Sequence, residues 1–176
     1  MFDLWGVRCG LLALTMMLRM EVNVVRADAP KAAQEDVKVY STNRRFYAVS
    51  HLKEQKTAVF RARAATKPEW EMDGYFQVLF LSDDGQHLVE GYPGGNLLDL
   101  DVKPGDSFLV FFVAGKRVAT LTVGDVFPDI GALAETTSGR AWGDFWGFEG
   151  PTRFTLQLPN ERKITFDAST GKRVRR

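Results

Sequence analysis

The sequence is poor in cysteine and histidine. Its 176 residues include one cysteine, Cys9, and two histidines, His51 and His87. One cysteine cannot form an internal disulfide, so a folded domain has to rely on its hydrophobic core. The sequence also lacks the His-x-His and His-Glu-x-x-His patterns of catalytic zinc sites. We therefore expect no metal site and no other cofactor.

An excess of charge of either sign is also missing. Lys and Arg number 23 and Asp and Glu number 22, which gives a formal net charge of +1 at pH 7. Proteins that attract nucleic acid through their overall field are usually strongly basic, so we do not expect a nucleic-acid partner. Hydrophobic residues make up 45% of the chain and charged residues 26%, which is typical of one globular domain and not of a disordered chain.

The chain lacks an apolar run of the roughly 20 residues that a membrane-spanning helix needs. Its most apolar stretch, "CGLLALTMML" from Cys9 to Leu18, has ten residues and is bounded by Arg8 and Arg19. Such a run is typical of the core of a secretory signal. The small residue that ends "VRA", Ala27, marks the expected cleavage site.

We accordingly expect residues 1–27 to be a signal peptide, with no membrane span left after its removal and a periplasmic or secreted location for the mature protein. A buried helix at this position or a misassigned start codon is the alternative, because Asp3 adds a negative charge to the leading segment. Residues 28–36, "DAPKAAQED", are polar and rich in alanine, which is typical of a linker. Residues 37–176 are expected to form a single β domain.

Short apolar segments alternate with turns throughout the expected β domain. Each has about five to eight residues, with Gly, Pro, Asn or Asp between them, and this pattern predicts an all-β fold of antiparallel meanders. "SFLVFFVA" (107–114) and "YFQVLFL" (75–81) are almost continuously apolar, so we expect central strands that are buried on both faces. One short helix is expected within residues 125–135, with Asp125 as its N-cap.

Similar turns recur along the domain. "STNRRFYAV" from Ser41 and "SDDGQHLV" from Ser82 start 41 positions apart, and each leads into an apolar strand. "FFVAGKRVATL" and "FDASTGKRV" each end a strand in a small-residue Gly-Lys turn. These turns resemble those of β-propeller blades, in which a Ser-x-Asp-Gly hairpin opens a strand and an Asp-x-x-Thr-Gly-Lys turn closes one. The chain also resembles small exported bacterial β-rich proteins of unknown function with a "SDDG…GG" core.

The resemblance implies propeller-blade-like meanders across residues 37–172. The spacing of the turns fits a blade period of about 40–45 residues. The mature chain is long enough for about three such blades, whereas closed propellers have at least about four. The expected closed form is therefore either an incomplete propeller or a β-sandwich.

The stretch "FLSDDGQHLVEGYPGG" (80–95) gathers carboxylates, a histidine and glycines, as an active site would. Asp and Gly also suit tight hairpins, so "SDDG" predicts a solvated turn in which Gly85 has a positive φ. His87 and Glu90 follow on an expected strand, where alternation points them to opposite faces. We therefore interpret this stretch as a turn between two strands.

The glycine-rich run "GYPGGN" (91–96) lacks the Lys and the following helix of a phosphate loop, so it predicts a plain loop. Tyr92 and Asn96 in this loop are candidates for lining a surface cleft. These two residues are the part of the loop that we expect to bind a ligand.

The aromatic segment "WGDFWGFEG" (142–150) has the most distinctive pattern. On a regular strand Trp142, Asp144 and Trp146 share one face. Large aromatics beside glycines favour a core strand that is packed closely against its neighbours. The alternative is an exposed aromatic platform, on which Asp144 would hydrogen-bond a sugar ring or a partner protein.

The sequence therefore predicts a non-catalytic protein with a binding or protein-interaction role in the bacterial envelope. Its expected partner is a protein or a glycan. A Gly-x-Ser-x-Gly nucleophile elbow is absent from the sequence. The alternative is an envelope hydrolase that acts on glycan, with carboxylates from residues 69–73 or 83–90.

Overall fold

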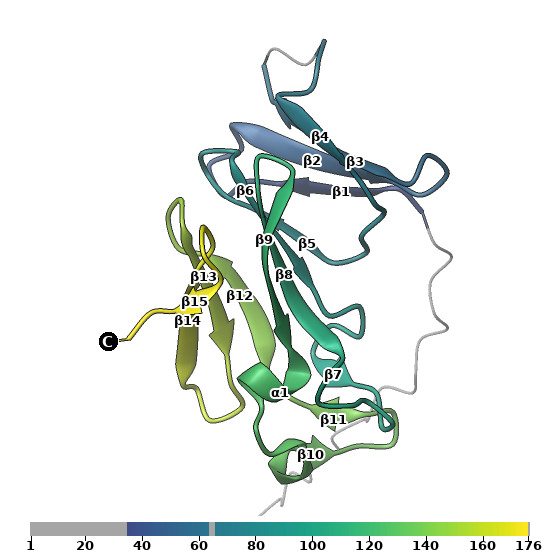
Figure 1. The fold of residues 1–176 in the computed structure, drawn as a ribbon, viewed down its shortest axis with the longest axis vertical. Coiled ribbons are helices and arrows are strands. Elements are labelled where there is room, and N and C mark those ends of the chain that lie inside the picture. Colours follow the sequence, from purple (N-terminus) through teal and green to yellow (C-terminus); the bar gives the residue numbers. More distant parts are fainter. Residues whose placement is uncertain (1–34, 64–65, 176) are drawn as a thin grey trace, which may run out of the picture. The chain divides into compact units, whose positions relative to one another are not determined.

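The computed structural model describes residues 35–63 and 66–175, and they fall in one compact unit (Figure 1). The expected signal peptide, residues 1–27, lies outside the described residues, as does most of the expected linker. Within the described residues, no helix is both long and apolar enough to cross a membrane.

Most strands belong to three four-stranded antiparallel sheets. The first sheet contains β1 (Val37–Tyr40), β2 (Phe46–His51), β3 (Lys56–Arg61) and β4 (Trp70–Asp73). The second contains β5 (Leu79–Leu81), β6 (His87–Gly91), β8 (Ser107–Val113) and β9 (Lys116–Thr122). The third contains β12 (Asp144–Phe148), β13 (Arg153–Gln157), β14 (Lys163–Asp167) and β15 (Lys172–Arg173).

A small sheet and two short helices connect the larger sheets. The small sheet contains β7 (Leu97–Leu98), β10 (Ala134–Glu135) and β11 (Arg140–Ala141). The helices are α1 (Val123–Val126) and the 3-10 helix η1 (Ile130–Ala132). The prediction of a short helix in this region is confirmed, since both helices lie between the second and third sheets in the sequence.

The predicted cap of this helix is wrong. Thr122 is the N-cap of α1, and its hydroxyl accepts a hydrogen bond from the N–H of Asp125 at 3.3 Å. Asp125 is the third helical residue, and its carboxylate accepts the backbone N–H of Thr122 at 2.8 Å. The two residues form a capping box, which has the threonine outside the helix and the acid inside it.

The all-β class and the antiparallel meanders are confirmed. β8 is a central strand, as expected, because it pairs with both β6 and β9 and is buried along most of its length. The same prediction for "YFQVLFL" is wrong, because β5 begins only at Leu79 and pairs with β6 alone. The apolar residues before it belong to a loop, from which the ring of Phe76 packs on Phe112 at 5.5 Å between centroids.

The two turns that match in the sequence have the same hydrogen bonds. Ser41 Oγ donates to Asn43 Oδ1 at 2.9 Å and accepts the backbone N–H five residues later at 3.1 Å. Ser82 Oγ donates to Asp84 Oδ1 at 2.5 Å and accepts the backbone N–H five residues later at 3.0 Å. Gly85 in the second turn has a φ of +70°, which confirms the predicted hairpin geometry.

A further hydrogen bond recurs in all three large sheets. The residue after the third strand is an alanine in each, namely Ala62, Ala114 and Ala168. Its N–H donates to the carbonyl of the residue just before the second strand of the same sheet, at 2.9, 2.8 and 2.7 Å respectively. The three sheets therefore share this hydrogen bond as well as the order of their strands.

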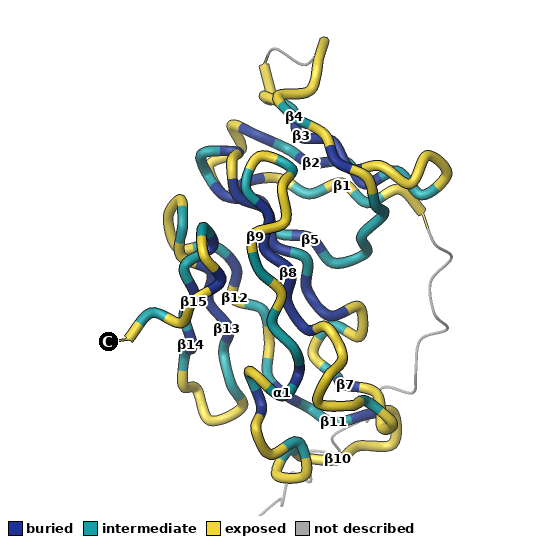
Figure 2. Tube along the Cα trace, in the orientation of Figure 1, coloured by how far each residue is buried: buried dark blue, intermediate teal, exposed yellow. Residues whose placement is uncertain are grey.

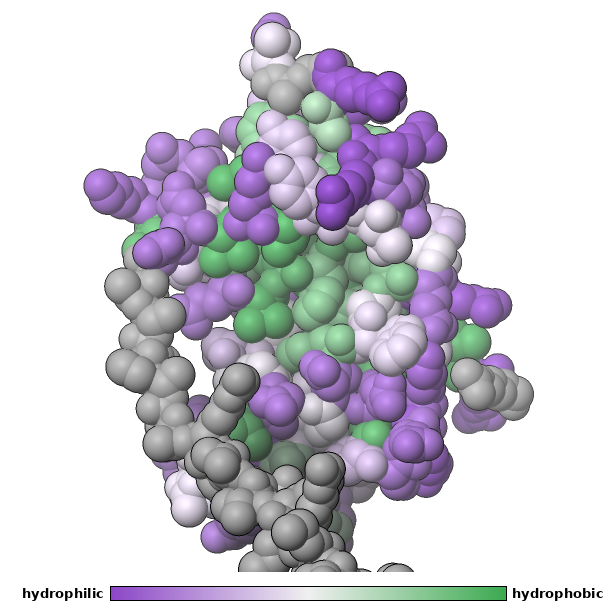
Figure 3. All heavy atoms as spheres, turned by 180° about the vertical axis from the view of Figure 1, so that it is seen from behind, coloured by the Kyte–Doolittle hydropathy of each residue, from purple (hydrophilic) through white to green (hydrophobic). Residues whose placement is uncertain are grey.

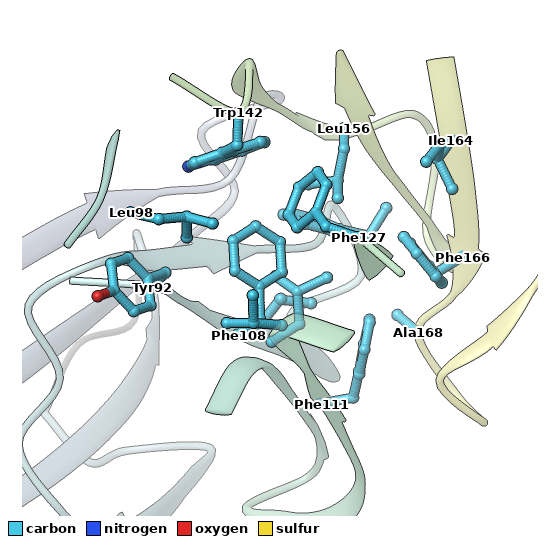
Figure 4. Packing of buried hydrophobic residues seen from close by; sticks show 14 residues of the cluster. Tyr92, Leu98, Phe108, Phe111, Phe127, Trp142, Leu156, Ile164, Phe166 and Ala168 are labelled. Carbon is cyan, nitrogen blue, oxygen red and sulfur yellow. The ribbon is translucent and has the colours of Figure 1, made fainter. Parts of the chain in front are cut away.

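Buried side chains pack in two clusters. Figure 2 marks the buried residues along the trace of the chain. One cluster joins the first sheet to the second, and β2 contributes through strict alternation of buried and partly exposed residues. The larger cluster joins the second sheet to the third and to the small sheet (Figure 4). Phe108 lies within it, with its ring edge-on to Phe127 at 5.1 Å and to Trp142 at 5.0 Å.

Some large apolar side chains stay on the surface of the described residues. The face seen in Figure 3 has apolar residues in its middle and hydrophilic residues around them. The large apolar residues with the most exposed surface are Tyr40, Leu100, Val118 and Trp146. Tyr40 and Trp146 belong to the first strands of their sheets, β1 and β12.

Candidate functional site

The first strands of the three large sheets lie next to one another and line a groove. β1 contacts β5, and β5 contacts β12. Each pairs with only one other strand among the described residues, so each is an edge strand. The groove has a volume of about 360 Å³, which is within the range of ligand pockets. We name it the edge groove, and its lining residues are Val39, Tyr40, Thr42, Leu79, Phe80, Leu81, Trp146, Gly147 and Phe148.

The edge groove combines aromatic side chains with free strand edges. Tyr40 and Trp146 are 53% and 55% exposed. Phe80 and Phe148 add half-buried rings to the same lining. An edge strand also presents backbone N–H and C=O groups that have no partner strand. The groove can therefore contact both the apolar side chains and the backbone of a ligand.

Trp146 lies in the groove because β12 has a β-bulge. The register between β12 and β13 shifts between Phe145 and Gly147, which leaves Trp146 as an extra residue. A bulge takes the extra side chain out of the regular alternation of the strand. Lys163 holds the exposed ring, because its Nζ lies 3.6 Å from the ring centroid and 3.4 Å from the Glu149 carboxylate.

The predicted alternation along residues 142–148 is wrong, because β12 begins only at Asp144 and then bulges. Trp142 precedes the strand and is fully buried, and its indole N–H donates to the carbonyl of Gly95 at 2.7 Å (Figure 4). The core interpretation is therefore confirmed for Trp142. It is wrong for Trp146, because more than half of the surface of this residue is exposed to solvent.

Of the five residues predicted to bind a ligand, Trp146 alone lines the edge groove. Asp144 is exposed, and its Oδ1 accepts the backbone N–H of Phe145 at 2.8 Å. Asn96 is also exposed, and its backbone carbonyl accepts the backbone N–H of Trp142 at 3.2 Å. These residues support the local backbone and do not converge on one ligand.

Tyr92 is part of the core and not of an open cleft. It is 7% exposed and its ring stacks on Phe108 at 6.2 Å between centroids. Its hydroxyl donates to Asp99 Oδ2 at 2.8 Å. Burial, together with the hydrogen bond and charge of Asp99, raises the pKa of Tyr92 to about 12. The phenol therefore remains protonated and acts as a buried hydrogen-bond donor.

The acidic residues considered for glycan hydrolysis form separate surface contacts. Glu71 pairs with Lys56 at 3.3 Å, and Glu69 pairs with Arg61 at 2.9 Å. In residues 35–63 and 66–175, no group of three or more His, Cys, Asp or Glu side chains could hold a metal ion. Glu69 and Glu71 are thus paired separately with cations of β3.

Asp84, His87 and Ser169 form a chain that resembles the triad of a serine hydrolase. Asp84 Oδ1 lies 3.3 Å from His87 Nδ1, and His87 Nε2 lies 3.0 Å from Ser169 Oγ. An acyl-transfer site also needs backbone donors for the oxyanion. Here the N–H groups of residues 169–171 all donate to Asp167. We interpret these three linked side chains as a structural connection between the second sheet and the last hairpin of the third sheet.

Sequence reasoning missed Tyr40 and Phe80 as lining residues of the edge groove. Tyr40 did have a signal, because "VKVY" alternates Lys38 and Tyr40 with two valines, a pattern of a strand with one solvent face. The meeting of β1, β5 and β12 has no local signal, since it depends on how the sheets pack.

A scan against protein-family models finds no match, and a comparison with curated proteins finds no significant match either.

Proposed function

We propose that this protein is a non-catalytic binding module that takes up an extended segment of a partner protein in the edge groove. One observation carries the proposal: Tyr40 and Trp146, both more than half exposed, line a single groove between free strand edges. An extended peptide can pair with an edge strand through its backbone while alternate side chains enter apolar pockets. Exposed apolar clusters on soluble proteins commonly mark such interaction surfaces.

A polypeptide fits the edge groove better than a sugar. A sugar site needs polar side chains beside the aromatic ring to bond the hydroxyl groups. Thr42 is the one lining residue with a polar side chain besides the Tyr40 and Trp146 rings, and Asp144, the polar partner expected from the sequence, does not line the groove. The apolar lining instead matches the side chains of a peptide.

The first test selects a random library of about 12-residue peptides on the wild-type protein. We expect enriched peptides with alternating apolar residues, because alternate side chains of an added strand point into the groove. Trp146→Ala should weaken their binding at least about tenfold, since a central aromatic side chain often dominates an interface. Isothermal titration calorimetry measures the change in Kd.

Val118→Ala is the matched control, because Val118 on β9 is 43% exposed and does not line the groove. This variant should bind the selected peptides as tightly as the wild type. Hydrogen exchange should also slow in β1, β5 or β12 when peptide is bound. Peptides that bind Trp146→Ala and wild type equally would contradict the proposal. If the protein binds glycans on an array in a manner that depends on Trp146, and binds no peptide, the ligand of the edge groove is a sugar and not a peptide.

We further propose that the protein works in the periplasm or outside the cell. The apolar run from Cys9 to Leu18 and the small residue Ala27 that follows it support this location. Mass spectrometry of the protein from its native host is expected to find a chain that begins at Asp28. A chain that still carries Met1 in the soluble fraction of the cell would show that this segment is not a cleaved signal.

A further inference from the structure

A second and larger groove lies between β9 and α1 on one wall and β14 and β15 on the other. Its volume is about 920 Å³, and it shares no lining residue with the edge groove. We name it the basic groove, and its lining residues are Leu121, Asp125, Val126, Arg162, Lys163, Ile164, Thr165, Phe166, Gly171, Lys172, Arg173, Val174 and Arg175.

Most cations of the basic groove form no ion pair with the described residues. Five of its lining side chains are cationic: Arg162, Lys163, Lys172, Arg173 and Arg175. Lys163 pairs with Glu149, whereas the other four form no ion pair in the part of the chain that the structure describes. Two cations of the first sheet, Lys56 and Arg61, are by contrast each paired with a glutamate.

Asp125 is the one carboxylate among the lining residues, and it is already engaged. Its Oδ2 accepts the backbone N–H and the hydroxyl of Thr122, each at 2.8 Å. These bonds lower the pKa of Asp125 and tie its charge to the start of α1. The lining of the basic groove thus has five cationic side chains and one carboxylate, which is already hydrogen-bonded to Thr122. The formal net charge of the whole chain is only +1. A concave site lined by one sign of charge concentrates ions of the opposite sign.

We propose that the basic groove binds a linear anionic glycan, whose sulfate, phosphate or carboxylate groups contact Arg162, Lys172 and Arg173. Guanidinium groups bind such oxyanions through paired hydrogen bonds, and this suits Arg162 and Arg173 on the wall formed by β14 and β15. A groove of about 920 Å³ also has room for several sugar units. This site is separate from the peptide-binding role proposed for the edge groove.

Other polyanions fit the basic groove less well. Single-stranded nucleic acid binds through exposed aromatic rings on which its bases stack. Phe166 is the aromatic lining residue of this groove, and it is only 5% exposed. An acidic folded protein presents a broad surface, whereas the cations here line a concave site that a single chain can enter. A flexible anionic glycan can enter such a site as a single chain, and it needs no exposed aromatic rings for its binding.

The test titrates the full protein with three probes of equal charge: a heparin-derived hexasaccharide, a short oligo-dT and an oligoglutamate peptide. We expect the hexasaccharide to bind at least about tenfold more tightly than either of the other two. Lys172→Gln/Arg173→Gln should weaken its binding about tenfold or more. The slope of log Kd against log salt concentration should also fall by about 2, since about one counterion is released per contact.

The matched control is Lys53→Gln/Lys103→Gln, which removes the same charge from two exposed lysines outside both grooves. It should leave hexasaccharide binding unchanged, and so should Tyr40→Ala, which tests the edge groove independently. Equal losses in the two double variants would show general charge attraction and overturn the proposal. Absence of binding to the hexasaccharide, or equally tight binding of oligo-dT or oligoglutamate, would overturn it as well.

Discussion

Trp142→Ala is expected to lower the free energy of unfolding by about 3–5 kcal/mol. The side chain is fully buried, and its ring packs edge-on against Phe108 at 5.0 Å and Phe145 at 4.7 Å. Its removal leaves a cavity and also leaves the carbonyl of Gly95 without its indole donor. Since domains are usually stable by only about 5–15 kcal/mol, this one change should remove a large part of the stability. Urea denaturation followed by circular dichroism measures the loss.

Trp146→Ala is the matched control for this prediction, because it deletes the same side chain from an exposed position. It removes the contact with Lys163, and a cation–π contact at an exposed site contributes only about 0.5–1 kcal/mol. We therefore expect a loss of about 1 kcal/mol or less. If the two variants unfold at the same urea concentration, the assignment of one tryptophan to the core and one to the surface is incorrect.

Gly85→Val is expected to destabilise the protein by about 2–6 kcal/mol, in two ways. Gly85 has a φ of +70°, which strains a β-branched residue by about 1–3 kcal/mol. A Cβ at this position would also lie 2.5 Å from the ring of Phe46, and such overpacking costs about 1–3 kcal/mol more. Phe46 is buried between the first and second sheets, so it has little room to move. Thermal and urea unfolding should both show the loss.

Two substitutions in equivalent turns serve as controls. Asp84→Asn should change stability little, because Asn43 accepts the corresponding bonds from Ser41 Oγ and the Arg45 N–H in the first turn. An asparagine Oδ1 at position 84 can also still accept a hydrogen bond from His87 Nδ1. Arg44 occupies the position that corresponds to Gly85 and has a φ of +55°, so Arg44→Gly should be neutral or stabilising. A large loss in Asp84→Asn, or wild-type stability in Gly85→Val, would show that the turn is not held by these contacts.

The turns and the alternating strands could be predicted because their causes are local. Ser82, Asp84 and Gly85 form their hairpin through bonds that span at most five residues. β4 was missed because "PEWEMDG" is rich in acids and offers no run of apolar residues. It forms a strand because it pairs with β3, while the indole N–H of Trp70 donates to the carbonyl of Gly85 at 2.8 Å. Both partners are distant in the sequence.

In the candidate site, too, some features have local causes and others depend on residues elsewhere in the chain. "WGDFWGFEG" was recognised as unusual, yet its alternation predicted the wrong face for Trp146, because a bulge depends on the register of the partner strand β13. The cations of the basic groove come from Arg162 and Lys163 at the start of β14 and from residues 172–175. Nothing in a net charge of +1 predicts their convergence.

The sequence by itself determined the all-β class, the antiparallel meanders and the recurrent turns, because hydrophobic alternation and turn chemistry act over a few residues. Only the tertiary structure decided which strands are edges, which tryptophan is exposed and which residues line each groove. Tyr40, Phe80 and Trp146 meet because three sheets pack with their first strands together. Such packing depends on side chains far apart in the chain, and local sequence patterns carry no record of it.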